Sequence, residues 1–468
     1  MRDLNICLIN DSFPPEIDGV ANAVTNYAGI ISRDFGRATV VTPKHPQADD
    51  GAYPFPVLRY PSVDMTRFVG YRAGFPFAPD IQKRLEAEHF DLIHSHCPIT
   101  STMFARSLRY AMDVPVVLTY HTKFDIDIAN AIGSRLLQDE AKRLLVQNIS
   151  ACDEVWTVSR GAGENLRALG FEGGYTVMPN GVDFPRGRVS EALIESVTAG
   201  YDLPQGLPLF LFVGRMMWYK GLRLILDALK LLRESGRDFR MVFVGAGNDK
   251  DEVEAYSDSL GLSDRVFFSP PIRDREQIRA WYCRSDVFLF PSTFDTNGLV
   301  VREAAACALG SVLVAGSCAA EDVTDGVSGW LIDENAEAMA AKLRELCAAP
   351  ESMAQVGEGA QRELYMSWDA SVARACEAYA VVIDNYKRGL YPARERVSDE
   401  MFRASSQMMD AIARSRDKQR SRRDGLMSGY MEMRQEIKTR QEQVKDKLEA
   451  GQEKIKDRLE ELVHDRFL

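Results

Sequence analysis

The sequence predicts an α/β protein with two facing, doubly wound parallel-sheet domains, followed by a long helical extension. Three observations lead to this prediction. Strand-like apolar runs alternate with amphipathic segments, the pattern stops and restarts in the middle of the chain, and residues 394–468 contain no such run. Continuous apolar runs that alternate with helices are typical of parallel sheets covered on both faces.

The first set of runs defines an expected N-terminal domain at 1–190, and the second set an expected domain at 191–390. Between them, residues 183–208 are rich in proline and glycine, as in a joint. We expect the last helix, about 369–388, to return to the first domain. The expected strands are 5–10, 38–42, 91–96, 115–120, 154–158 and 175–178, then 209–213, 241–244, 266–269, 287–290, 311–315 and 330–332.

Composition excludes several classes of protein. A chain of 468 residues is too long for one ordinary core, and its formal net charge of −11 argues against a general affinity for nucleic acid. Eight single cysteines without a C-x-x-C pair indicate free thiols in a reducing compartment. Because we find neither a signal-peptide pattern nor an apolar run of about 18 residues, we expect a cytoplasmic protein.

Functional residues are expected directly after the strands, where doubly wound sheets bind ligands. The first such loop, residues 10–20, is long and leads into a helix near Val20. Long loops at this edge commonly hold function. His121 directly follows the strand 115–120. Since a lone histidine is more often structural, both interpretations of His121 stay open.

Arg215 and Lys220 lie in the short loop after the strand 209–213, next to Gly214. Glycine lets the backbone approach a ligand closely, and a guanidinium with an ammonium supplies the donors that a diphosphate needs. A solvated surface loop is the competing interpretation, and it also stays open.

Asp295 and Glu303 are two carboxylates with seven residues between them, at the start of the helix that follows the strand 287–290. A helix N-terminus carries unpaired N–H donors and the positive end of the helix dipole, which suit a phosphate. Carboxylates suit sugar hydroxyls, so together these groups suit a nucleotide sugar. Taken alone, the pair could be ordinary helix capping.

Two further motifs do not predict the sites they resemble. His94-Ser95-His96 has the alternation of a metal-binding strand, but no third ligand lies nearby and His94 is expected to point into the core. Gly245-Ala246-Gly247-Asn248 lacks the third glycine of a dinucleotide fingerprint and is interpreted as a turn beside a nucleotide. No metal site is predicted.

In this order, the motifs resemble those of the retaining glycosyltransferases of family 4, which have the GT-B architecture of two Rossmann-like domains. The resemblance covers about residues 4–390. It rests on Asp11 to Gly19, on Thr119-Tyr120-His121-Thr122, on Pro179-Asn180-Gly181-Val182-Asp183, on Val213-Gly214-Arg215 with Lys220-Gly221, and on the acid pair within 291–305.

The resemblance implies how the nucleotide is held. Arg215 and Lys220, beside Gly214, would bind the donor diphosphate and neutralise the leaving group. Glu303 would bind the ribose hydroxyls, and Gly19 would approach the phosphate from the opposite domain. No metal and no other cofactor would be needed, because the two cations and the helix dipole neutralise the charge.

The resemblance also implies how the sugar is held. Asp295 would contact hydroxyls of the transferred sugar, and His121 would lie beside the reacting sugar. The backbone N–H groups of Asn297, Gly298 and Leu299 would reach that sugar or the phosphate. Transfer would retain the anomeric configuration by front-side attack, with the departing phosphate as the base, so that the protein contributes positioning and electrostatics.

Three positions depart from the family pattern. Asp295 stands where glutamate is usual, Asn297 stands where phenylalanine is common, and Asp18-Gly19 replaces a Gly-Gly pair. Because aspartate is one methylene shorter than glutamate, the first departure bears on the identity of the donor sugar more than on the activity.

The extension at 394–468 carries an eleven-residue repeat, seen at 433–437, 444–448 and 455–459. Eleven residues over three turns place the apolar pairs on one nearly straight stripe of a helix. A self-associating coiled coil and a helix on a lipid surface both fit this stripe, and the basic stretch 414–423 suits anionic headgroups. A solvated extension is the third alternative.

The predicted activity is the transfer of a hexose from a UDP- or GDP-sugar to a cell-envelope acceptor, with a membrane glycolipid or lipid-linked glycan favoured. The enzyme would then be cytoplasmic or peripheral on the inner face of the cell membrane. Two alternatives are a nucleotide-sugar epimerase on the same scaffold and a catalytically weak assembly protein that acts through its tail.

Overall fold

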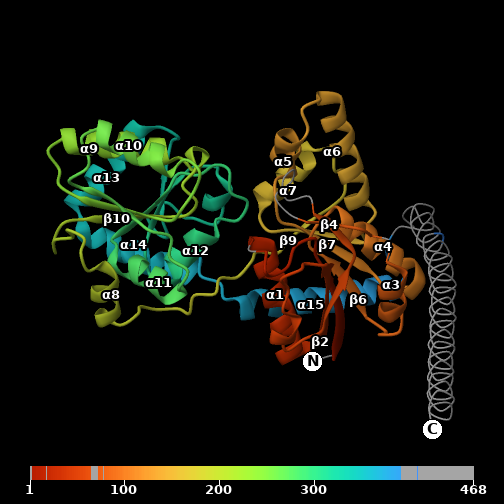
Figure 1. The fold of residues 1–468 in the computed structure, drawn as a ribbon. Helices are drawn as coiled ribbons and strands as arrows, with labels where there is room; N and C mark the ends of the chain where they lie inside the picture. Colours follow the sequence, from red (N-terminus) through yellow and green to blue (C-terminus); the bar gives the residue numbers. More distant parts are fainter. Residues whose placement is uncertain (1–2, 17, 65–71, 77, 392–407, 409–468) are drawn as a thin grey trace, which may run out of the picture. The chain divides into compact units, whose positions relative to one another are not determined.

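The computed structural model describes residues 3–16, 18–64, 72–76, 78–391 and 408, and within them shows two parallel sheets covered by helices (Figure 1). This confirms the predicted α/β class. The predicted tail, 394–468, lies outside the described residues apart from Met408. No helix in the described part of the chain is long and apolar enough to cross a membrane.

The first sheet has the strand order β3-β2-β1-β6-β7-β8-β9, with every neighbouring pair parallel. Successive residues of a strand face opposite sides, so β1 contributes Ile6 and Leu8 to one core and Cys7 and Ile9 to another. The strands are β1 (Leu4–Ile9), β2 (Gly36–Pro43), β3 (Val57–Tyr60), β6 (Leu92–Ser95), β7 (Val116–Tyr120), β8 (Glu154–Thr157) and β9 (Thr176–Val177).

Helices cover both faces of this sheet. Helix α1 packs on one face, and α3, α4, α6 and α7 on the other. The helices are α1 (Gly19–Ile30), continued by the π-helical turn η1 (Ile31–Phe35), the short η2 (Asp50–Ala52), α3 (Pro79–Glu86), α4 (Thr100–Met112), α5 (Phe124–Ala131), α6 (Arg135–Ser150) and α7 (Arg160–Ala168).

The second sheet has the order β12-β11-β10-β13-β14-β15, again with parallel neighbours. Its strands are β10 (Leu209–Val213), β11 (Arg240–Val244), β12 (Val266–Ser269), β13 (Val287–Phe290), β14 (Ser311–Val314) and β15 (Trp330–Ile332). Its helices and helical turns are α8 (Glu191–Thr198), η3 (Trp218–Lys220), α9 (Leu222–Glu234), α10 (Lys250–Ser259), α11 (Arg275–Arg284), α12 (Leu299–Ala306), η4 (Cys318–Ala320), α13 (Ala336–Ala348) and α14 (Pro350–Glu363).

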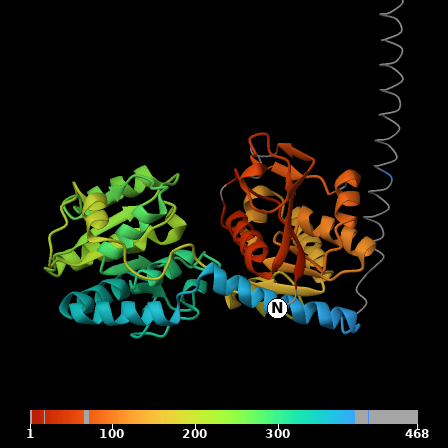
Figure 2. The ribbon, with the colours of Figure 1, turned by 90° about the horizontal axis from the view of Figure 1, so that it is seen from below.

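The last described helix, α15 (Trp368–Lys387), follows the second domain in sequence but packs on the first (Figure 2). Trp368, Val372 and Tyr379 are buried in the same core as Ile6 and Leu8 of β1. Helix α15 therefore packs against α1 and belongs to the core of the first domain.

The strand β3 and the antiparallel pair β4 (Ser62–Asp64) and β5 (Arg72–Gly74) were not predicted. Each is short and at an edge, and none reads as a continuous apolar run in the sequence. Since edge strands are partly exposed, they lack the pattern on which the other strands were predicted.

Strand order reverses between β1 and β6 in the first sheet, and between β10 and β13 in the second. Ligands of doubly wound sheets bind at such switch points, beyond the carboxyl ends of the strands.

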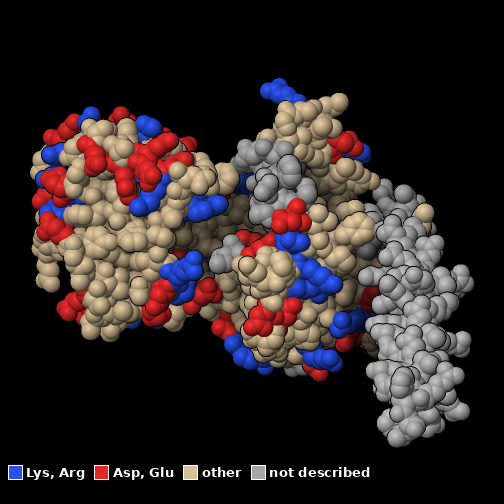
Figure 3. Space-filling model, viewed as in Figure 1, with Lys and Arg blue, Asp and Glu red and all other residues tan. Residues whose placement is uncertain are grey.

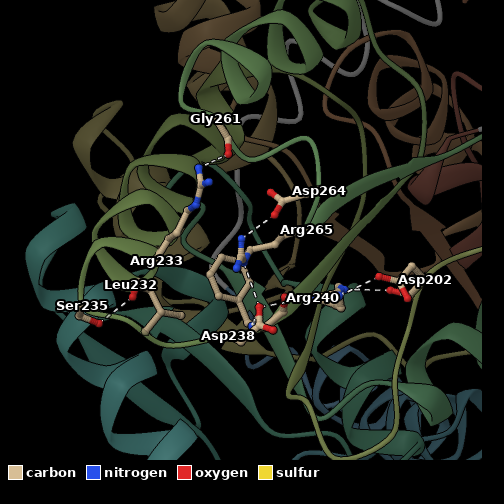
Figure 4. A network of polar contacts seen from close by, with 10 residues as sticks. Asp202, Leu232, Arg233, Ser235, Asp238, Arg240, Gly261, Asp264 and Arg265 are labelled. Atoms are coloured by element: carbon tan, nitrogen blue, oxygen red, sulfur yellow. Dashed lines mark hydrogen bonds and ion pairs between the residues drawn. The ribbon is translucent and has the colours of Figure 1, made fainter.

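At the opposite ends of β11 and β12, charged side chains pair with one another. Asp238 accepts hydrogen bonds from Arg240 and Arg265, and Arg240 also binds Asp202 (Figure 4). The charges of Arg240 and Arg265 at this end of the sheet are thus paired within the protein.

Candidate active site

A cleft of about 1050 Å³ lies at the two switch points. Loops that follow β1, β6 and β7 line it from the first domain, and loops that follow β10 and β13 line it from the second. Its lining includes nearly every residue predicted from the sequence, namely Gly19, His121, Gly214, Arg215, Lys220, Asp295, Asn297, Gly298 and Leu299.

The first loop is fixed by two aspartates. Asp11 is buried and accepts hydrogen bonds from the backbone N–H and hydroxyl of Ser101 at 2.8 and 2.6 Å, at the start of α4. Asp18 caps α1, since its Oδ1 accepts from the N–H groups of Val20 and Ala21 at 2.7 Å. Asp18 thus explains one departure from the family pattern, because an N-cap aspartate replaces a glycine without cost to the helix.

Gly19 is the first residue of α1 and is exposed to the cleft. A methyl group added at its Cα would meet no atom of the described residues within 4 Å. Neither packing nor backbone conformation therefore requires glycine here. A glycine at a cleft-facing helix start leaves room for a ligand to approach the backbone.

The two predicted cations differ in their surroundings. Arg215 is exposed and forms no ion pair with any residue that the structure describes. Lys220 is buried, with its side chain 8% exposed, and its Nζ lies 2.6 Å from Asp295 Oδ1. The guanidinium is free to bind an anion, whereas the ammonium already shares its charge with a carboxylate.

The loop before α12 ends in Gly298, whose φ of 56° lies in the left-handed region. A Cβ at Gly298 would lie 2.8 Å from that of Ala319, so only glycine fits. Among the described residues, none accepts from the backbone N–H groups of Asn297, Gly298 or Leu299. Two side-chain atoms of this loop, Asp295 Oδ2 and Asn297 Nδ2, are also buried without a described partner. The loop therefore presents both donors and an acceptor beside the cleft.

With this geometry described, comparisons with known proteins identify the family. Residues 17–186 match the family model described as Glycosyltransferase Family 4, and residues 195–363 match that of Glycosyl transferases group 1. A D-inositol 3-phosphate glycosyltransferase of Xylanimonas cellulosilytica is 30% identical over 306 residues, which are 62% of this chain and 72% of that protein. The chain belongs to glycosyltransferase family 4. It is a glycosyltransferase with the GT-B fold.

Solved structures agree on the fold of this glycosyltransferase. A sucrose-phosphate synthase from Thermosynechococcus elongatus has a TM-score of 0.65 at 20% identity, over 81% of this chain and 99% of that one. The HepE protein of Anabaena, in complex with UDP-glucose, has a TM-score of 0.62 at 18% identity, over 82% of this chain and 100% of that one. Structural relatives of the enzyme thus bind a nucleotide sugar.

Glu303 is set back from the cleft of the glycosyltransferase and does not line it. It lies on α12, is 8% exposed, and accepts hydrogen bonds from Arg275 and from the Tyr282 hydroxyl, both on α11. Burial raises the pKa of Glu303, and Arg275 opposes that shift. Its role as a ribose ligand stays a prediction. Arg275 and Tyr282 lay far from the motif in sequence, so the spacing of the two acids could not reveal them.

His121 lies at the cleft of the enzyme, but a second histidine accompanies it. His96 also lines the cleft, and its Nδ1 is 3.0 Å from His121 Nε2. His94 points into the core, where its ring nitrogens bind Tyr379 and Thr119 hydroxyls. The sequence had suggested His96 only as part of a metal motif. Like His121, it directly follows a central strand, and that position was the available signal.

The expected turn at residues 245–248 supports the loop that carries Arg215 and Lys220, and does not line the cleft. Met216 N–H donates to the Ala246 carbonyl, and a Cβ at Gly247 would lie 2.1 Å from the Met216 carbonyl oxygen. In the described ranges, no three His, Cys, Asp or Glu side chains gather to hold a metal ion. That the glycosyltransferase needs no metal stays a prediction.

Proposed function

We propose that this enzyme transfers a hexose, with retention of anomeric configuration, from a UDP- or GDP-sugar to a cell-envelope acceptor, either a membrane glycolipid or a lipid-linked glycan. One observation carries the nucleotide-sugar part of the proposal. Within the described part of the chain, the Arg215 guanidinium has no ion-pair partner and the N–H groups before α12 have no acceptor, and both line the same cleft as the Lys220–Asp295 pair. A diphosphate needs the first two, and a hexose suits the third.

In the proposed mechanism, Arg215 and Lys220 bind the donor diphosphate. Negative charge grows on the phosphate as its bond to the anomeric carbon lengthens, and the two cations and the α12 N-terminus stabilise that charge. The acceptor hydroxyl attacks from the same face of the sugar. Its proton passes to the departing phosphate oxygen, so no protein side chain has to act as the base.

Asp295 would orient the sugar in this mechanism. Its Oδ1 binds Lys220, and its second oxygen, Oδ2, is buried without a described partner. A sugar hydroxyl could donate to Oδ2, which accepts but cannot donate in the ionised state. The short side chain of Asp295 therefore makes Lys220 and the sugar share one carboxylate.

The preference for a membrane acceptor is supported by an apolar arm. Helices α5 and α6 follow directly after His121, and α6 exposes Leu136, Leu137 and Leu144 by 79, 60 and 52%. Figure 3 shows tan, uncharged atoms over much of this arm, with Lys or Arg at its tip and charged side chains along one side. Exposed leucines next to Arg135 fit the interface of an anionic bilayer. The predicted contact of residues 394–468 with lipid, or their self-association, is a further part of the proposal.

A soluble acceptor is the second candidate. Several relatives are named D-inositol 3-phosphate glycosyltransferases, at 26–30% identity. A phosphorylated cyclitol would then replace the lipid-linked acceptor. The same donor cleft serves either acceptor. The two candidates therefore differ only in the acceptor that binds on the side of the first domain.

The decisive experiment measures nucleotide release from a panel of UDP- and GDP-sugars, with extracted membrane lipids, with inositol 3-phosphate, or with neither. Release that depends on lipid supports the proposal, and release that depends on inositol 3-phosphate supports the second candidate. Sugar interconversion without any acceptor would identify an epimerase. Absence of both release and binding across the panel would falsify the transferase proposal.

Two variants test the membrane contact. Leu136→Ser with Leu137→Ser should weaken sedimentation with phosphatidylglycerol vesicles and lower turnover of a lipid acceptor, while nucleotide binding stays unchanged. Val381→Ser is the matched control, since Val381 is 59% exposed on α15, away from the arm.

Truncation after residue 393 tests the tail. If truncation abolishes the cellular role while Lys220→Ala preserves it, the assembly alternative is correct.

A further inference from the structure

His96 and His121 form a hydrogen-bonded pair at the cleft. They follow the neighbouring parallel strands β6 and β7, and His96 Nδ1 lies 3.0 Å from His121 Nε2. The rings are stacked, with centroids 5.3 Å apart. His96 is 2% exposed and His121 is 7% exposed. Few other conformations are open to either ring at this burial.

The surroundings hold the His96 ring in place. The His94 ring lies 3.9 Å from it, centroid to centroid, and the Tyr27 ring packs edge-on at 5.3 Å. His94 is in turn fixed by hydrogen bonds at 2.6 and 2.7 Å to Tyr379 on α15 and Thr119 on β7. The orientation of His96 therefore rests on rigid elements of the first domain.

Both histidines of the pair are neutral. Burial lowers the pKa of His121 to about 3 and that of His96 well below its usual value, with the neighbouring histidines adding to the latter shift. A neutral imidazole carries one N–H and one acceptor nitrogen. The hydrogen bond between the two rings therefore contains a single proton. Which ring donates that proton determines the tautomer of both rings.

The unpartnered nitrogen of His96 decides the direction. His96 Nε2 is buried and has no hydrogen-bond partner among the described residues. If Nε2 carried the proton, a buried N–H would stay unsatisfied, which is rarer than an unsatisfied acceptor. The proton is therefore on His96 Nδ1, which donates to His121 Nε2. His121 must then carry its own proton on Nδ1.

We propose that His96 is a positioning residue that holds His121 in the Nδ1–H tautomer, with that N–H available to the cleft. His121 then serves as an uncharged hydrogen-bond donor to an oxygen of the bound sugar, and not as a proton acceptor. The tautomer follows from the ring geometry, the unpartnered His96 Nε2 and the neutral state of the buried rings, whereas the role toward a sugar rests on the proposed function. The assignment agrees with a transfer in which the departing phosphate takes the proton.

Nitrogen NMR of the free enzyme tests the tautomer directly. The chain has six histidines, so ¹⁵N-histidine labelling gives few signals, and His121→Gln assigns the His121 pair. We expect His121 Nδ1 to resonate as a protonated nitrogen and Nε2 as an unprotonated one. In His96→Leu, this preference should be lost, while in His96→Asn, whose amide replaces the Nδ1–H donor, it should persist. Protonation of His121 at Nε2 in the unaltered enzyme would overturn the proposal, whether or not any sugar is transferred.

Kinetics test the consequence. His96→Leu should lower kcat by about tenfold while the KM for the donor changes little, and His96→Asn should recover most of the loss. Tyr386→Phe is the control, since it removes a hydrogen bond to Asp113 in the first domain and touches none of the residues that hold the pair. Equal losses in the Asn and Leu variants, or the same loss in Tyr386→Phe, would show a merely structural effect and contradict the positioning role.

Discussion

Lys220 Nζ lies 2.6 Å from Asp295 Oδ1, and this ion pair joins the loop after β10 to the loop after β13. The Lys220 ammonium also lies 5.5 and 5.6 Å from the ring centroids of Tyr219 and Phe294. Aromatic rings and burial keep water from the pair on these sides. Lys220 therefore holds the Asp295 carboxylate in position at the cleft.

Replacing Lys220 should be costly to catalysis. In Lys220→Ala, the leaving phosphate loses a cation and Asp295 loses its partner, so we expect kcat to fall by about 100-fold or more. Nucleotide release from the donor found in the panel measures the effect. Lys250→Ala is the control, because Lys250 also forms an ion pair, with Glu254 at 2.9 Å, but lies on α10 outside the cleft. A loss of less than about threefold in Lys220→Ala would contradict the assigned role.

Arg215→Ala should affect binding without affecting stability. Arg215 has no ion pair within the described part of the chain, so its loss should change the free energy of unfolding by less than about 0.5 kcal/mol. The affinity for UDP or GDP should fall by about tenfold or more, because a charge-assisted bond to phosphate is lost. Titration calorimetry at low and high salt checks this. Unchanged nucleotide affinity would mean that the diphosphate lies elsewhere in the cleft.

Replacement by alanine should affect two glycines of the site differently, with a loss of stability at Gly221 and a loss of activity alone at Gly19. At Gly221, φ is +78° and a Cβ would lie 2.8 Å from Pro291 Cγ, so Gly221→Ala should destabilise the protein by about 1–3 kcal/mol. At Gly19, a Cβ meets no atom in the part of the chain that the structure describes, so Gly19→Ala should leave the melting temperature nearly unchanged. If phosphate approaches Gly19, that variant should still lose activity by about tenfold. Full activity of Gly19→Ala would remove Gly19 from the phosphate site.

The sequence predicted the fold and the site residues well where buried strands, and short loops directly after them, determine where a residue lies. Every strand of the second sheet falls on a predicted apolar run, and Arg215, Lys220 and Asp295 come together because parallel strands end at one edge. Periodicity could not indicate β3 or the β4–β5 pair, since exposed edges carry no continuous apolar run. It also could not give the partner of Asp295, because side-chain pairing across two loops depends on their tertiary approach.

Glu303 shows a second limit, that of predicting a site residue from its separation in sequence from another. A residue eight positions after Asp295 on the following helix was expected at the cleft, yet the carboxylate turns to Arg275 and Tyr282 of α11. Arg275 also stacks on Phe184, 4.4 Å from the ring centroid. Helix-to-helix contacts of this kind leave no local signal in the sequence. His96 was not predicted because the alternation in His94-Ser95-His96 resembles a metal-binding strand. Its position directly after β6 is the signal that points to the cleft.

The buried histidines predict a loss of stability in mild acid. His94, His96 and His121 all have pKa values lowered by burial in the folded protein, in the case of His121 to about 3. In the unfolded chain, they bind protons near pH 6.5, so the unfolded state takes up protons that the folded state does not. Their stabilisation is thus complete above about pH 6.5 and is lost as the pH falls toward the folded values. Well below pH 6.5, each of these histidines should lower the free energy of unfolding by about 1.4 kcal/mol for every unit by which the pH falls.

His94→Gln isolates one of these contributions. Glutamine keeps a polar group near Tyr379 and Thr119 but cannot take up a proton, so the variant starts less stable yet should lose less stability between pH 7.5 and pH 5. Urea unfolding at several pH values, followed by tryptophan fluorescence, gives the two slopes. Replacing the exposed Lys83 by glutamine serves as the control, because it changes a surface side chain and none of the three histidines. Equal slopes for His94→Gln and the unaltered protein would mean that His94 is protonated in the folded state.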